Sequence, residues 1–158
     1  MNALPSLRSV RAEPPAPFAA TAAFEHLEHA QFVFMREAFR AHGGLVNTDA
    51  AVECLRGACD QPISRLARWI VGGEIVIVSW QQQTWVPLFQ LQARAAAIEP
   101  ACADAITELR EAFSDWEIAL WFATPNDRLS GATPVARRRD DPAEVCRAAR
   151  LDRLVAAG

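Results

Sequence analysis

E-I-V-I-V-S-W-Q-Q-Q-T-W-V-P-L-F-Q-L, residues 74–91, interrupts a chain whose other periodic segments are helical. Its first seven residues are a β-branched run, which is typical of a strand. The polar Q-Q-Q-T predicts a turn, and the remaining residues predict a returning strand, with Trp80 and Trp85 packed against each other. Pro87 cannot donate to a ladder, so we expect an edge strand or an extended exit there. The stretch therefore predicts one β-hairpin.

Two short helices are expected just before the hairpin. Asn47 or Thr48 can cap the first helix and Gly57 can end it, while Pro62 suits the first position of the second helix. The second helix has an apolar side that we expect to face inward, formed by Ile63, Leu66 and Ile70. Its opposite side carries Ser64, Arg65 and Arg68. Helix, turn, helix and hairpin is the order of a helix-turn-helix with a β wing, whose second helix can lie in the major groove of DNA.

Arg65 and Arg68 are three residues apart and share one outward face. Arginine suits contacts with guanine and phosphate. However, two arginines form a small patch, the hairpin turn is uncharged, and strong DNA binding usually needs several phosphate contacts. Two interpretations stay open: a DNA-binding module, or a module of the same shape retained as a scaffold.

The N-terminal segment, residues 1–20, carries four prolines among alanine and serine and predicts a disordered arm. A long helix is predicted from Phe24 to about His42, ended by two glycines. Its apolar period runs through Phe24, Leu27, Gln31, Phe34 and Ala38, widened by Phe32 and Phe39. His26 and His29 have metal-compatible spacing, but no further ligand has recognisable spacing, so we expect surface histidines and no metal.

The chain is predicted to be helical again from Pro100 onward. Ser114 or Asp115 can cap a helix that ends at Pro125. The pairs Thr133-Pro134 and Asp141-Pro142 each place a capping residue before a proline, which predicts two further helix starts. In the last helix, the residues expected to face inward are Val145, Ala148, Leu151 and Val155.

Composition narrows the function classes. At 158 residues, half of them apolar, the chain fits one domain or two small ones sharing a core. A net charge of −3 gives no general attraction to nucleic acid or acidic membranes. The four cysteines form no CxxC pair and are expected to be buried, reduced thiols. There is no membrane-length apolar segment, no signal-peptide pattern and no common enzyme motif. We expect a cytoplasmic protein that is not an enzyme, with no catalytic residue, cofactor or metal.

The segment W-F-A-T-P-N-D-R-L-S-G-A-T-P-V, residues 121–135, carries no recognisable catalytic chemistry. Its prolines, asparagine and glycine punctuate the backbone between helices, which suits a shaped docking surface. Six arginines follow, at Arg137, Arg138, Arg139, Arg147, Arg150 and Arg153. They form either a solvated face balanced by nearby acids or a surface for an acidic partner.

Several of these segments, spanning about residues 45–158, together resemble the Xre/MbcA/ParS toxin-binding family of bacterial antitoxins. The upstream segments are S-R-L-A-R-W-I followed by G-G-E-I, and then V-P-L-F-Q-L. The tail residues that carry the resemblance are Trp121, Pro125, Asn126, Leu129, Gly131, Pro134, Val145, Ala148 and Ala149. After Pro134 the chain has V-A-R-R-R, where the family usually has a hydrophobic or acidic-hydrophobic run.

The resemblance implies an antitoxin that binds a protein toxin, often of the NAD-consuming RES type, and blocks the toxin's active site with its C-terminal region. Many members also bind and repress their own promoter, and many are homodimers. The implied DNA-facing residues are Gln61, Ser64, Arg65 and Arg68. The partner-facing residues are expected to be Pro125, Asn126, Leu129, Gly131, Pro134, Arg147, Arg150 and Arg153. We hypothesise that the rigid turn sets the angle of the last helix, which offers its arginines to an acidic rim on the partner.

We therefore expect a mainly α protein with one β-hairpin. Its parts would be a disordered arm (1–20), a winged helix-turn-helix-like part (21–95) and a small C-terminal helical, toxin-binding-type domain that binds the partner (96–158). The expected function is antitoxin-like neutralisation of a protein toxin, with operator DNA as a second partner and no membrane. The alternative is a stand-alone helix-turn-helix transcriptional regulator without a toxin.

Overall fold

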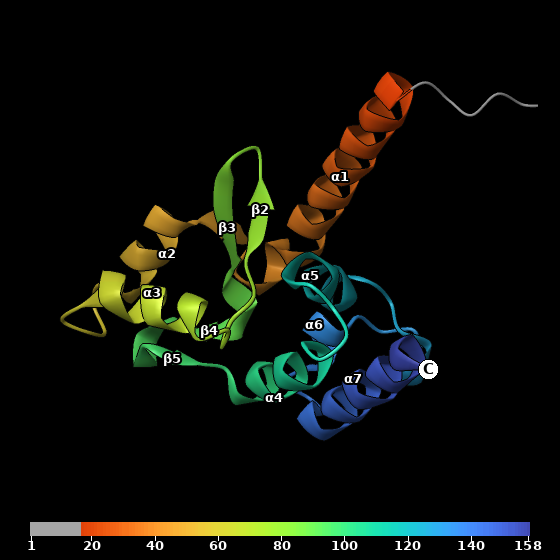
Figure 1. Cartoon of the computed structure of the whole chain (residues 1–158). Helices are drawn as coiled ribbons and strands as arrows, with labels where there is room; N and C mark the ends of the chain where they lie inside the picture. Colours follow the sequence, from red (N-terminus) through yellow and green to blue (C-terminus); the bar gives the residue numbers. More distant parts are fainter. Residues whose placement is uncertain (1–16) are drawn as a thin grey trace, which may run out of the picture.

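Residues 17–158 are described by this structure, which is a computed structural model. The predicted arm, residues 1–20, lies mostly outside the described residues, and its last four residues form the start of the first helix. The first half of the described chain is a helix, a strand, two helices and a hairpin (Figure 1). These elements are α1 (Pro17–Phe39), η1 (Arg40–His42), β1 (Leu45–Asn47), α2 (Thr48–Leu55), α3 (Pro62–Val71), β2 (Val78–Trp80) and β3 (Gln83–Pro87).

The second half is helical apart from a short two-stranded ribbon that the sequence did not predict. Its elements are η2 (Leu88–Gln90), β4 (Leu91–Gln92), η3 (Ala93–Ala95), β5 (Ala97–Ile98), α4 (Pro100–Leu109), α5 (Asp115–Ala123), η4 (Asp127–Leu129), α6 (Pro134–Arg137) and α7 (Pro142–Ala157). The fold is mainly α with small antiparallel sheets, which confirms the predicted class at this level.

Local chemistry explains most helix boundaries. The side chain of Asn47 accepts a hydrogen bond from the backbone of Ala50 at 2.9 Å and begins α2. Gly43 ends η1 with a φ of 100°. A Cβ on Gly43 would lie only 3.0 Å from the Cβ of Leu88, so both backbone conformation and space favour glycine.

The hairpin belongs to a three-stranded antiparallel sheet in the order β1-β3-β2. Of the two alternatives predicted for Pro87, the edge strand is wrong, because β3 lies in the middle. The extended exit is correct, because Pro87 ends β3 with an extended backbone. Pro87 is tolerated because it is the last residue of β3, opposite Leu45, and the next N–H, of Leu88, reaches the carbonyl of Gly44 at 2.9 Å. The turn uses positive φ at both Gln81 and Gln82, as a two-residue hairpin loop requires.

The first hairpin strand is shorter than its β-branched run predicts. It starts at Val78, because the backbone of Val76 pairs with a buried side chain instead of a strand. Gln90 accepts from the amide of Val76 at 2.9 Å and donates to its carbonyl at 2.8 Å. The side-chain amide of Gln90 thus replaces two ladder hydrogen bonds.

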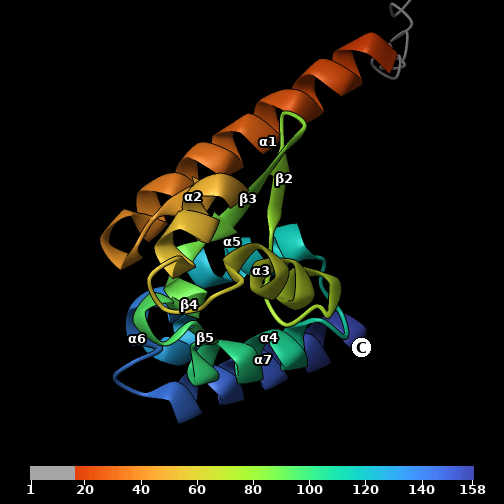
Figure 2. The same ribbon diagram turned by 90° about the vertical axis from the view of Figure 1, so that its left-hand side faces the viewer.

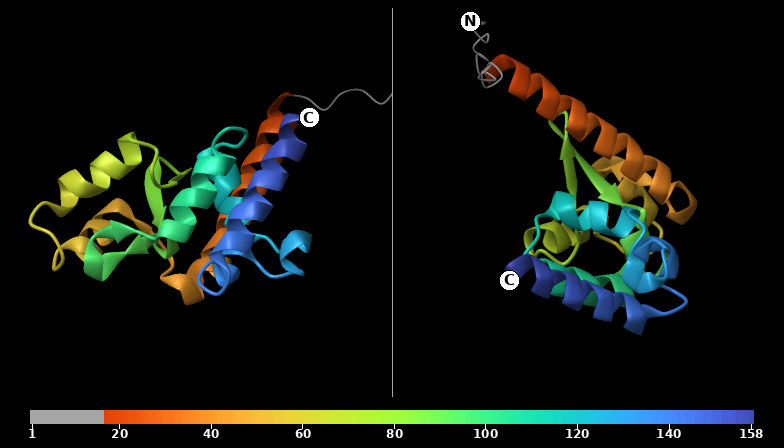
Figure 3. Two further views of the ribbon diagram at one scale, coloured as in Figure 1. Left: turned by 90° about the horizontal axis from the view of Figure 1, so that it is seen from below. Right: turned by 90° about the vertical axis from the view of Figure 1, so that its right-hand side faces the viewer.

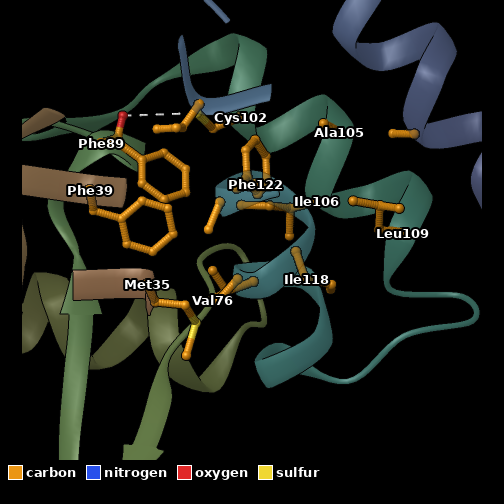
Figure 4. Close-up of a cluster of buried hydrophobic side chains, with 14 of the residues drawn as sticks. Met35, Phe39, Val76, Phe89, Cys102, Ala105, Ile106, Leu109, Ile118 and Phe122 are labelled. Carbon is orange, nitrogen blue, oxygen red and sulfur yellow. Dashed lines mark hydrogen bonds between the residues drawn. The ribbon is translucent and has the colours of Figure 1, made fainter. Parts of the chain in front are cut away.

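One large core joins the two halves of the chain (Figure 4). It places Phe39 of α1 against Phe89, with ring centroids 4.8 Å apart, and Phe89 against Phe122 of α5 at the same distance. A smaller core lies between α2, α3 and the sheet and contains Leu55, Leu66 and Trp69, among others. Residues 21–95 and 96–158 therefore share their main hydrophobic core.

Helix α1 projects beyond this core, as Figures 1 and 2 show. Its buried residues are Phe32, Met35 and Phe39, whereas Phe24, Leu27 and Phe34 of the predicted apolar face are 61%, 55% and 44% exposed. The helix also starts at Pro17, seven residues before the predicted start. Periodicity indicated the apolar residues correctly, but the core covers only part of that face.

Candidate interaction surfaces

The turn between α5 and α6 is organised around a single carboxylate. Asp152 of α7 accepts hydrogen bonds from Trp121 Nε1 and Asn126 Nδ2, each at 2.8 Å. Its other oxygen accepts from Arg128 Nε at 2.7 Å. Burial alone would raise the pKa of Asp152, but the hydrogen bonds from Trp121, Arg128 and Asn126 outweigh it and hold the pKa below its ordinary value. The turn is thereby fastened to the last helix.

Some of the turn residues that carry the family resemblance are buried. Leu129 and Pro134 are buried, and the backbone N–H of Asn126 donates to the carbonyl of Ala132 at 3.0 Å. Gly131 has a φ of +79°, and a Cβ there would meet nothing within 4 Å. Only Pro125 and Gly131 of the five predicted turn residues are exposed. Leu129 and Pro134 therefore shape the turn from within, instead of forming its outer surface.

Two of the three predicted partner-facing arginines of α7 are engaged by α4, which lies alongside (Figure 3). Arg150 donates to Glu108 through Nε at 3.0 Å and Nη2 at 2.7 Å. Arg153 also reaches Glu108, at 3.4 Å, and pairs with Glu111. Arg147 is exposed and forms no ion pair with any of the described residues. Arg147 is thus the one of the three that stays available.

The outer face of α7 is more apolar than its sequence predicted. Leu151, Leu154 and Val155 are 40%, 55% and 72% exposed, so the expectation that Leu151 and Val155 face inward is wrong. The buried residues of α7 itself are Val145, Ala148 and Ala149. Arg147, Leu151 and Leu154 follow the i, i+4, i+7 spacing of one helix face. Together with Val155 they form a stripe, which we call the α7 stripe.

The four predicted DNA-facing residues lie together. Gln61, Ser64, Arg65 and Arg68 line one surface depression of about 240 Å³ beside α3, together with Cys59 and Asp60. Arg65 turns toward the β4–β5 ribbon, where its Nη1 lies 3.4 Å from the carbonyl of Ala96. Ile63, expected to face inward, is 69% exposed, so the outward side of α3 is partly apolar.

The hairpin leans on α1 (Figure 2). Trp80 stacks on Phe32 with ring centroids 4.0 Å apart, and Trp85 meets the same ring edge-on at 5.2 Å. The two tryptophans were predicted to pack against each other. Instead, they pack against Phe32 of α1, which lay outside the local sequence pattern.

The arginine run after Pro134 is divided between three environments. Arg137 pairs with Glu144 at 3.5 Å, Arg139 is exposed, and Arg138 is only 3% exposed. Sequence reasoning did not distinguish these three residues, since no neighbouring residue indicates that one of them is buried.

The histidines and cysteines noted in the sequence do not gather into a metal site within the described part of the chain. His26 and His29 are exposed, and residues 17–158 contain no cluster of three or more His, Cys, Asp or Glu that could hold a metal ion. All four cysteines are free, but only Cys102 is buried; Cys54 is exposed, contrary to expectation. Within the same described range, no helix combines the length and apolarity needed to cross a membrane.

Comparisons with models of protein families, with curated proteins and with solved structures find no match for this chain.

Proposed function

We propose that the chain is an antitoxin-like binding protein that neutralises a protein toxin through its C-terminal helices. The observation that carries this proposal is the α7 stripe, where Leu151, Leu154 and Val155 are exposed beside Arg147. Exposed apolar side chains gathered on one face mark interaction sites more often than scattered ones do. Arginine beside apolar residues is also a common composition at the centre of protein interfaces.

The surroundings of α7 favour a preformed docking surface. Asp152 ties the helix to the turn through Trp121, Asn126 and Arg128, and Arg150 ties it to α4. A helix that is already rigid loses little conformational entropy on binding. Arg150 and Arg153, which were expected to contact the partner, thus support the binding helix, and we assign the contact itself to the α7 stripe, which includes Arg147. By resemblance, a toxin of the RES type is the first partner to test.

The proposal is tested by co-expressing the chain with a RES-type toxin and measuring growth and complex formation. Changing Leu151 and Leu154 together to Ser should weaken the complex by about 10- to 100-fold per residue, as for central interface positions. The matched control is Val33→Ser, which removes a comparably exposed apolar side chain, 49% exposed, from α1. Full growth rescue by the double variant at limiting expression would contradict the proposal.

A second function, operator binding through α3, is favoured by the connectivity of the first half. The element order α1-β1-α2-α3-β2-β3, with sheet order β1-β3-β2, fits a winged helix-turn-helix. In that arrangement α3 is the helix that enters the major groove. Ser64 and Arg68 lie on its outward side, with Gln61 at its start.

Operator binding is tested by fluorescence anisotropy with the DNA upstream of the chain's own gene, at several salt concentrations. Arg68→Ala should weaken binding and lower the slope of log affinity against log salt by about one if Arg68 contacts a phosphate. Arg56→Ala is the control, because Arg56 is exposed directly after α2 and already paired with Glu53 at 2.7 Å. Equal effects of the two substitutions would argue against α3 as the DNA-binding helix.

A further inference from the structure

A broad hollow on the surface lies between the β4–η3 segment, the start of α4 and the loop before α7. Its volume is about 790 Å³. The charged residues that line it are Arg94, Glu99, Asp104, Arg138 and Arg139. Neither the α7 stripe nor the α3 surface includes any of these residues.

Arg138 is the unusual member of this lining, because it is a charged residue of which only 3% is exposed to solvent. Its Nε donates to the carbonyl of Phe89 at 3.2 Å, and its Nη1 donates to the carbonyl of Val135. The same Nη1 lies 3.3 Å from Nδ1 of His42, and the guanidinium sits 5.7 Å from the centre of the Phe89 ring. Among the described residues, no carboxylate forms an ion pair with Arg138 and none of the recorded hydrogen bonds uses Nη2.

Burial lowers the pKa of Arg138, and the nearby charge of Glu99 offsets this only in part, without forming an ion pair. Burial raises the pKa of Cys102 to about 12, so this thiol stays neutral at physiological pH. Burial, together with Arg138 and Arg139, lowers the pKa of His42, so the imidazole is neutral as well. Burying a charge without a counter-ion is costly, and the cost falls when an opposite charge binds nearby.

The two acids of the lining already have other interactions. Glu99 accepts a hydrogen bond from Gln92 Nε2 at 3.3 Å. Asp104 also acts on Cys146 of α7, whose pKa is raised by burial and by the charges of Asp104 and Glu108. Three arginines against two carboxylates leave the lining with a net positive charge.

We propose that this hollow binds a single oxyanion group, a carboxylate or a phosphate, through Nη2 of Arg138 at its floor and through Arg139 and Arg94 at its rim. Guanidinium groups bind both oxyanions with strong, charge-assisted hydrogen bonds. Glu99 and Asp104 restrict the site to one anionic group, since a longer polyanion would meet their charges.

His42 provides a built-in reporter for the test. The imidazole resonances of the three histidines are followed by NMR while inorganic phosphate, or in a second series acetate, replaces chloride at constant ionic strength. Binding should give a saturable shift of the His42 signal and raise its pKa, because the bound anion offsets Arg138 and Arg139. His26 and His29 lie on exposed parts of α1 and should not respond in this way.

Arg139→Gln should weaken binding about tenfold, as expected for the loss of one charge-assisted hydrogen bond. Its control is Arg147→Gln, which removes an exposed arginine that does not line the hollow. Tighter binding of phosphate than of acetate would identify a phosphate-type ligand, and tighter binding of acetate would identify a carboxylate. The proposal is overturned if neither anion gives a saturable His42 shift, if all three histidines shift alike, or if the two arginine variants behave identically.

Discussion

Asp152→Asn is the substitution that tests most directly whether one carboxylate holds the C-terminal turn together. The change keeps the size of the side chain but removes its charge. It weakens the hydrogen bonds from Trp121 and Asn126 and breaks the ion pair with Arg128. The side chain of Asp152 is only 23% exposed, so solvent compensates for little of this loss.

The expected loss of stability follows from the three interactions of Asp152. A hydrogen bond to a charged acceptor stabilises a protein by roughly 1 kcal/mol more than one to a neutral acceptor. Two such bonds therefore contribute about 2 kcal/mol to the difference. The partner Arg128 is 41% exposed, so its ion pair adds no more than about 0.5 kcal/mol. We expect the free energy of unfolding to fall by about 2–2.5 kcal/mol at neutral pH.

The lowered pKa of Asp152 predicts how the difference in stability between the two proteins changes with pH. Because the pKa of Asp152 in the folded protein lies below its ordinary value of 3.8, folding favours the ionised form. Its contribution is complete above pH 3.8 and disappears as the pH falls through the lower, folded-state pKa. The difference between the native protein and Asp152→Asn should therefore shrink at low pH. Glu108 and Glu117, whose pKa values are also lowered, titrate in both proteins and cancel in the comparison.

Urea denaturation followed by circular dichroism, at neutral pH and at about pH 3, measures both quantities. Asp140→Asn is the matched control, because Asp140 is exposed and forms no ion pair with the described residues. A loss below about 0.5 kcal/mol at neutral pH would place Asp152 among ordinary surface positions. A loss of the same size at both pH values would show that its charge does not stabilise the turn.

Other predictions concern three separate positions. Gln90→Leu should lower the free energy of unfolding by about 2–4 kcal/mol in urea titrations, because it leaves the buried N–H and C=O of Val76 unpaired; a loss within the scatter of surface variants would contradict this. Gly131→Val should lower the free energy of unfolding by about 1–2 kcal/mol, because valine is strained at the positive φ of this position. Gly57→Val is the control, since Gly57 also lies in open space but has no positive φ, and it should not cause this loss. Equal losses for the two variants would refute the φ argument. In the native protein, iodoacetamide should modify Cys54 readily and Cys102 only after unfolding, as peptide mass spectrometry would reveal; native alkylation of Cys102 would show that the core opens locally.

Local chemistry in the sequence was sufficient to predict where several helices begin. Asn47, Ser114, Thr133 and Asp141 cap helices as expected, because a short polar side chain reaches the free N–H groups of the first turn wherever the helix lies in the fold. Strand β1 was missed because three residues, Leu45–Asn47, carry too little pattern. Its strand conformation depends on β3, which lies about forty residues later in the chain.

Long-range partners also explain the errors in the predicted surfaces. Periodicity shows which face of a helix is apolar, but another element must be present to cover that face. Leu66 and Trp69 find such cover, whereas Ile63 does not. The same holds for α7, where Val145 is buried and Val155 is exposed. A single exposed apolar side chain such as Ile63 is ordinary, whereas neighbouring ones such as Leu151, Leu154 and Val155 make a candidate interaction surface.

The arginine run shows why the candidate sites could not be read from residue type. Helix α6 ends at Arg137, and Arg138 still has a helical backbone as its C-cap, so successive residues of this last turn point to different places. Arg137 meets Glu144, Arg138 enters the core beside Phe89, and Arg139 stays in solvent. Arg150 and Arg153 are likewise taken up by α4. Three of the six arginines that made the tail a candidate for an acidic partner are thus paired with carboxylates of the protein itself. The other three are Arg147 in the apolar α7 stripe, Arg139 in solvent, and the buried Arg138, which forms no ion pair within residues 17–158.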